Sequence, residues 1–192
     1  MDLVPEEILH DILYLRLHIP VDVFCEFPET TYPQYLPNQS VKTLGAPASS
    51  VLLVSQKWLR VATPILYESV RIANASHTRL LASQLKARPY IGPYIKNIRL
   101  EGGYNLQFIE YLAYTPNLHT LYLSWRGVSG PDTVQGLMEA LPVFNPTKFY
   151  LHAPQWSNQT MREVLVTLGT SLARWPSLVS IVSFPDLAKK SW

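Results

Sequence analysis

The feature of the sequence that most constrains its fold is a short apolar segment that recurs five times after residue 68. The segments read SVRIA, NIRLE, TLYLS, KFYLH and VSIVSF, and they centre on Arg71, Arg99, Tyr122, Tyr150 and Val182. Successive centres are 28, 23, 28 and 32 residues apart. Each segment has the alternation typical of a strand, and the ranges between them, 76–87, 106–114, 132–141 and 159–174, have helical patterns. The sequence therefore predicts repeated strand–helix units.

A strand and a helix that alternate every 20 to 30 residues or so have the period of leucine-rich repeats. Each such unit has one buried face and stacks on its neighbours. We therefore expect an α/β fold in which residues 69–192 form a short leucine-rich-repeat-like solenoid. Its parallel sheet lines a concave face, and its helices lie outside. Gly102 and Gly103 supply the backbone freedom needed to leave the second strand.

Alternation along the strands predicts which side chains share a face. In PNLHTLYL, Leu118, Leu121 and Leu123 are expected to point inward and Tyr122 outward. The same rule places a row of side chains on the concave face, and we predict that they bind a target protein: Arg71, Arg99, Tyr122, Tyr150 and His152. Tyrosine and arginine are enriched at interface hot spots. The alternative is an ordinary solvated strand face.

The first 68 residues predict a helical module. A helix is expected over 4–18, where Pro5 suits the first helical position and Glu6 and Glu7 complement the positive helix end. Residues 20–47 are rich in proline and predict an inserted loop with one short turn near Val21.

Two further short helices are expected before the first strand. One is capped by Ser49 or Ser50 and runs to Trp58, and the other opens at Thr63-Pro64.

The segments LVPEEILHDILYLRL and LLVSQKWLRVATPILYESVRI resemble an F-box, the three-helix module that attaches substrate receptors to SCF ubiquitin ligases. Together with IKNIRLEGGY and PNLHTLYLSW, these segments make the sequence similar to a large group of F-box proteins of mushroom-forming fungi. The resemblance implies a substrate-recognition subunit that docks on the SCF adaptor and, through it, on the cullin. The residues it assigns to adaptor binding are Val4, Pro5, Ile8, Leu9, Ile12, Leu13, Leu52, Val54 and Trp58.

The sequence departs from the family in two ways. Val4 stands where the family usually has leucine, and Pro5 and Trp58 are separated by 53 positions because of the proline-rich insert. The alternative interpretation is therefore a stand-alone repeat scaffold for protein–protein interaction in which the insert has disabled the docking module.

Composition and motifs argue against other classes of function. The net charge of +2 is spread along the chain, which argues against nucleic acid as a partner. No apolar run approaches the roughly 20 residues that cross a bilayer. The single cysteine, Cys25, fits a reducing compartment, so we expect residence in the cytoplasm or nucleus.

The five histidines show no metal-ligand spacing, and no catalytic motif occurs, so we expect neither an enzyme nor a cofactor or metal. The end of the sequence, SFPDLAKKSW, supplies a strand but no full helix or polar capping unit after it. It favours a short relative or fragment of a longer receptor, with the last strand edge exposed.

Overall fold

The computed structural model describes residues 4–25, 48–125, 134–153 and 159–185. The chain divides into two compact units, Met1–Ser69 and Val70–Trp192, so the division lies beside the predicted boundary at residue 68. Most of the predicted insert, residues 26–47, lies outside the described residues.

The first unit is helical. It contains α1 (Glu6–Leu17), the short α2 (Val21–Cys25), the 3₁₀-helix η1 (Ala48–Leu53) and α3 (Gln56–Tyr67). Pro5 is the residue that caps α1 rather than its first helical residue, and Glu6 and Glu7 lie in the first turn as predicted. The expected turn near Val21 is confirmed as α2.

The predicted division between the second and third helices is wrong. The range 51–58 is not one helix, since η1 ends at Leu53 and Ser55 caps α3, accepting a hydrogen bond from the backbone N–H of Trp58 at 3.3 Å. Pro64 lies inside α3 instead of starting a new helix. A proline in a helix interior removes one backbone hydrogen bond, and here the packing of the apolar face of α3 outweighs that loss.

Helices α1 and α3 form the core of the first unit. Leu9, Leu13 and Leu17 of α1 pack with Ala62 and Ile65 of α3. Around this cluster lie the half-buried side chains of Val51, Leu52, Trp58, Val61 and Leu66. At the end of the pair, the ring nitrogen Nδ1 of His18 lies 3.1 Å from the Glu68 carboxylate.

The second unit is a mixed α/β structure with a five-stranded sheet. Its strands are β1 (Ser69–Ile72), β2 (Asn97–Leu100), β3 (Thr120–Ser124), β4 (Lys148–Ala153) and β5 (Ser180–Pro185), and they follow one another in the order of the chain. The pairs β2–β3, β3–β4 and β4–β5 are parallel. All five predicted strands are therefore confirmed.

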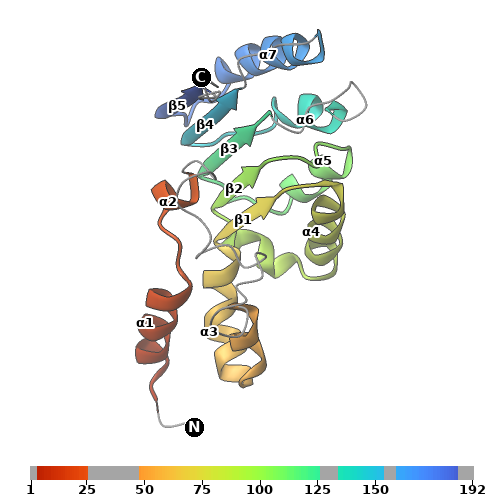
Figure 1. Cartoon of the computed structure of the whole chain (residues 1–192). Helices are drawn as coiled ribbons and strands as arrows, with labels where there is room; N and C mark the ends of the chain where they lie inside the picture. The colour runs from red at the N-terminus through yellow and green to blue at the C-terminus, as the bar shows by residue number, and fades with distance from the viewer. Residues whose placement is uncertain (1–3, 26–47, 126–133, 154–158, 186–192) are drawn as a thin grey trace, which may run out of the picture. The chain divides into compact units, whose positions relative to one another are not determined.

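The helices of the second unit confirm the predicted ranges, the first beginning one residue earlier and the other three being shorter. They are α4 (Ala75–Ala87), α5 (Gln107–Leu112), α6 (Gln135–Ala140) and α7 (Gln159–Leu172), and a 3₁₀-helix, η2 (Pro89–Tyr94), follows α4. Figure 1 shows α4 to α7 following one another along one side of the sheet. Asn74 caps α4 by accepting hydrogen bonds from the backbone N–H groups of Ser76 and His77, both at 3.0 Å.

The strands place their side chains in rows across the sheet. One row is Ile98, Leu121, Phe149 and Ile181, which occupy matching positions of β2 to β5. The Phe149 ring contacts Trp175 edge-on at 5.4 Å, just after α7, so this row faces the core. We call it the Phe149 row. Beyond β2, Gly103 has a φ of 73°, a conformation that suits glycine and confirms the predicted exit from the strand.

Candidate functional site

The exposed side of α1 is the strongest candidate for an interaction surface in the first unit. Ile8 and Ile12 are half exposed and Leu15 is almost fully exposed. Their spacing of four and three residues places them on one side of the helix. We call these three residues the α1 apolar face. Leu15 was missed by the sequence prediction, although it stands seven residues after Ile8 and continues the same stripe.

The four α1 residues that the resemblance assigns to adaptor binding, Ile8, Leu9, Ile12 and Leu13, do not share one exposed side of the helix. The two isoleucines are exposed, whereas Leu9 and Leu13 are buried in the core against α3. Neighbouring residues differ by about 100° around a helix, so the two pairs cannot point the same way. Leu9 and Leu13 support α1 from inside and are not accessible to a partner in this structure.

This division predicts different effects for two neighbouring residues. Leu13 is 2% exposed. Replacing it by alanine is expected to lower the unfolding free energy by about 3 kcal/mol, because a cavity opens beside Ala62 and Ile65. Ile12, which is 53% exposed, is expected to cost less than about 1 kcal/mol in the same change. Urea unfolding of Leu13→Ala and Ile12→Ala checks this, and equal losses would contradict the assignment of the two faces.

The remaining residues assigned to adaptor binding lie at different depths. Val4, Pro5 and Val54 are exposed, and Leu52 and Trp58 are half buried beside the core. Trp58 lies in the first turn of α3, whereas the sequence predicted it at the end of a helix. Two exposed leucines that the sequence prediction missed, Leu53 and Leu59, flank these positions.

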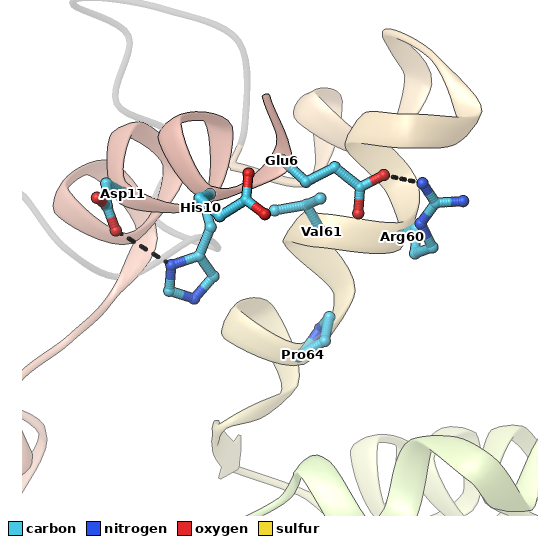
Figure 2. A pocket seen from close by; sticks show the side chains of 7 residues that line it. Glu6, His10, Asp11, Arg60, Val61 and Pro64 are labelled. Carbon is cyan, nitrogen blue, oxygen red and sulfur yellow. Dashed lines mark hydrogen bonds and ion pairs between the residues drawn. The ribbon is translucent and has the colours of Figure 1, made fainter. Parts of the chain in front are cut away.

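An open cleft of about 420 Å³ lies between α1 and α3. Its lining residues are Glu6, Glu7, His10, Asp11, Arg60, Val61 and Pro64. Figure 2 shows the Glu6 carboxylate pointing toward Arg60 of α3, with which it forms an ion pair. His10 and Asp11 contact each other at 3.4 Å on the other side. Three carboxylates and one arginine give this cleft an acidic character.

The predicted target-binding row lies in the second unit. The register confirms that Arg99, Tyr122 and Tyr150 occupy matching positions of β2, β3 and β4, and His152 follows two residues later on the same face. The prediction that this row is exposed is wrong. Arg99, Tyr122, Tyr150 and His152 are buried, and only Arg71 of β1 is partly exposed.

Part of this burial comes from the row packing against itself. The Arg99 guanidinium lies over the Tyr122 ring, 4.2 Å from its centroid, in a cation–π contact. Alternation correctly predicted which side chains share a face, but it does not indicate whether that face is covered. Whether these residues bind a target remains a prediction.

Glu101 joins two arginines of this face. Its carboxylate accepts hydrogen bonds from Nε of Arg71 at 2.9 Å and from Nε of Arg99 at 2.7 Å. Burial alone would raise the pKa of Glu101, but the hydrogen bonds and positive charges of the two arginines outweigh it and hold this pKa below its usual value. Glu101 is therefore a carboxylate at neutral pH.

Two other polar groups lie near the ends of β3 and β4. The buried Tyr104 hydroxyl donates a hydrogen bond to the Ser124 backbone carbonyl, and burial, followed by the charge of Glu101, raises its pKa. The Ser124 hydroxyl lies 3.4 Å from Nδ1 of His152, a pairing that the sequence did not predict. Both residues are buried, so a substrate cannot reach this pair in the structure described.

Among the described residues, no group of three or more His, Cys, Asp or Glu side chains is placed to hold a metal ion. None of the helices in the described ranges has the length and hydropathy needed to span a bilayer.

Comparison with protein-family models, with curated proteins and with solved structures gives no match.

Proposed function

We propose that the chain is a substrate-recognition subunit of an SCF-type ubiquitin ligase. The helical unit docks on the adaptor subunit and, through it, on the cullin, and the strand–helix unit presents a target protein for ubiquitin transfer. The subunit carries no catalytic residue of its own. This proposal rests on the F-box resemblance of the first and third helices and on the α1 apolar face.

The observation that carries the proposal is the division of α1 into two apolar sides. Leu9, Leu13 and Leu17 close the core, while Ile8 and Ile12 are left in water on a helix of 12 residues. A helix that only packs against its own fold needs one apolar stripe. An additional contiguous apolar surface, here extended by Leu15, is typical of a protein interaction site.

The second unit supports the role of receptor. Strands that follow one another in chain order, each with a helix on the same side, are what a leucine-rich-repeat-like solenoid requires. Under this proposal Arg71 is the accessible member of the target-binding row. Arg99, Tyr122, Tyr150 and His152 would meet a target only after their face is uncovered. The subunit would work in the cytoplasm or nucleus, where Cys25 stays reduced.

The docking role is tested by placing charges on the α1 apolar face. Ile8→Asp combined with Ile12→Asp is expected to weaken binding to a purified fungal SCF adaptor by at least about tenfold, because two buried carboxylates would face an apolar partner. The unfolding free energy is expected to change by less than about 1.5 kcal/mol, since both positions are exposed. Binding is measured by titration calorimetry and stability by urea unfolding.

Leu80→Asp is the matched control. Leu80 is an exposed leucine on α4, in the second unit, and its substitution should leave adaptor binding unchanged. If the folded wild-type chain does not bind the adaptor, the ligase proposal is wrong. Deletion of residues 26–47 then tests the alternative of a stand-alone scaffold with a disabled F-box. Binding that appears only after the deletion would favour the scaffold.

A further inference from the structure

Strand β5 forms one edge of the sheet. It pairs with β4 from Ser180 to Pro185, and within the described ranges no strand pairs with its other side. The alternate backbone N–H and C=O groups on that side therefore face outward. Such an edge is a ready template for a further strand.

The row of apolar core side chains also continues to this edge, where its last member is no longer covered. In the Phe149 row, Ile98 and Leu121 are 0% exposed and Phe149 is 1% exposed, whereas Ile181 of β5 is 54% exposed. Each of the first three has a neighbouring strand on both sides, and Ile181 has one. A strand that paired with β5 would place an apolar side chain beside Ile181 and extend the core row.

Part of the surface of α7, the helix that precedes β5, is also exposed. Leu165 and Val166 are exposed, and a Cβ atom added at Gly169 would meet nothing within 4 Å. Arg162 is exposed on the same side of the helix, one turn before Leu165 and Val166, so this side of α7 is mixed in character. The uncovered apolar surface is therefore that of β5 itself.

The charge pattern selects a second copy as the partner. The segment 175–185, WPSLVSIVSFP, contains no Asp, Glu, Lys, Arg or His. Exposed edge strands usually carry such charges, which prevent pairing with themselves. Two identical edges bring identical charges together, so a charged edge repels its own copy. The β5 edge has no such charges and is free of this repulsion. A charged peptide, by contrast, would find no counter-charge on β5.

We propose that two copies of the chain pair through their β5 edges as an antiparallel, two-fold symmetric dimer centred on Ile181. From 179 to 183 the exposed side chains are Val179, Ile181 and Ser183, which alternate along the strand and share one face. Centring the two-fold axis on Ile181 places this side chain opposite Ile181 of the second copy and Val179 opposite the second copy's Ser183. Ile181, which is 54% exposed in the single chain, is then buried against its own copy.

Oligomeric state tests the proposal directly. Light scattering coupled to size exclusion is expected to show a mass that rises with concentration to twice the 21.8 kDa of one chain. Ile181→Lys is expected to give a monomer throughout the same range, because like charges would meet at the symmetry axis. Val143→Lys, at an exposed valine before β4, is the control and should dimerise like the wild type. Circular dichroism verifies that both variants fold.

Cysteine cross-linking tests the register. Residues directly opposite in an antiparallel pair have Cα atoms about 4.5–5.5 Å apart, within disulfide range. Ile181→Cys is therefore expected to form a covalent dimer on mild oxidation. Val179→Cys should not, because its two copies would lie about 13 Å apart, four residues along the strand. Cys25 is buried and is left unchanged.

Three outcomes would overturn the proposal. A wild-type chain that stays monomeric at the highest concentration reached has no such dimer. A dimer that survives Ile181→Lys uses another surface. A dimer that cross-links through Val179→Cys and not through Ile181→Cys has another register.

Discussion

Replacing Gly136 by alanine is expected to lower the unfolding free energy of the second unit by about 3 kcal/mol. Gly136 lies at the start of α6, and a Cβ atom there would come within 1.9 Å of the Asn105 carbonyl oxygen and 2.7 Å of the Tyr104 carbonyl oxygen. Both are backbone atoms, which cannot rotate away as the end of a side chain can. The backbone N–H of Leu137 also donates to the Tyr104 carbonyl at 3.2 Å, so moving α6 outward would stretch this hydrogen bond.

Gly169→Ala in α7 is the matched control. A Cβ atom at Gly169 meets nothing within 4 Å, so the substitution adds no clash. Alanine is favoured over glycine in a helix interior, so we expect the unfolding free energy to rise by about 0.5–1 kcal/mol. Urea unfolding followed by circular dichroism measures both variants. Changes of the same sign would contradict the close approach of α6 to the segment after β2.

Replacing Glu101 by glutamine is also expected to have a large effect, lowering the unfolding free energy by about 3 kcal/mol at neutral pH. The substitution removes the negative charge that Arg71 and the buried Arg99 share. Removing one partner of a buried ion pair is costly because the remaining charge keeps its desolvation penalty. Glu139→Gln, at an exposed carboxylate of α6, is the control and should change stability by less than about 1 kcal/mol. Equal stability of wild type and Glu101→Gln at pH 7 would contradict the proposed role.

The lowered pKa of Glu101 also fixes the sign of a pH dependence. A carboxyl group with a lower pKa in the folded than in the unfolded chain contributes stability above its unfolded pKa, near 4.5. That contribution is lost as the pH falls through the folded value. The stability difference between wild type and Glu101→Gln should therefore be largest near neutral pH and shrink below about pH 4.5. Unfolding curves from pH 7 down to pH 3 or so measure it. A difference that stays constant with pH would show that charge is not its cause.

The strands could be predicted from the sequence because each carries its own signal. A strand such as TLYLS alternates over a few residues between polar or loop-like segments, and nothing distant in the chain is needed to recognise it. The helices of the second unit followed from the same local patterns. Pro64 misled the prediction because a proline is a typical helix start, and only the packing of α3 on α1 shows that the helix continues through it.

The candidate site was harder to predict because it depends on contacts between elements. In α1, Ile8 and Ile12 form a stripe, and so do Leu9 and Leu13, and both stripes have the four-residue spacing of a buried face. Only the position of α3 decides which pair is internal. For Tyr122, alternation gives the side of the sheet, but burial depends on neighbours such as Arg99 that come from another strand.

The order of the strands has a consequence for how the protein is made. β3 pairs with β2, β4 with β3, and β5 with β4, so each strand adds to one that precedes it in the chain. During translation, every new strand emerges from the ribosome after its pairing partner and needs no segment that is still to be synthesised. The sheet can therefore grow in the direction of synthesis, and the newest strand always forms the edge to which the next strand adds.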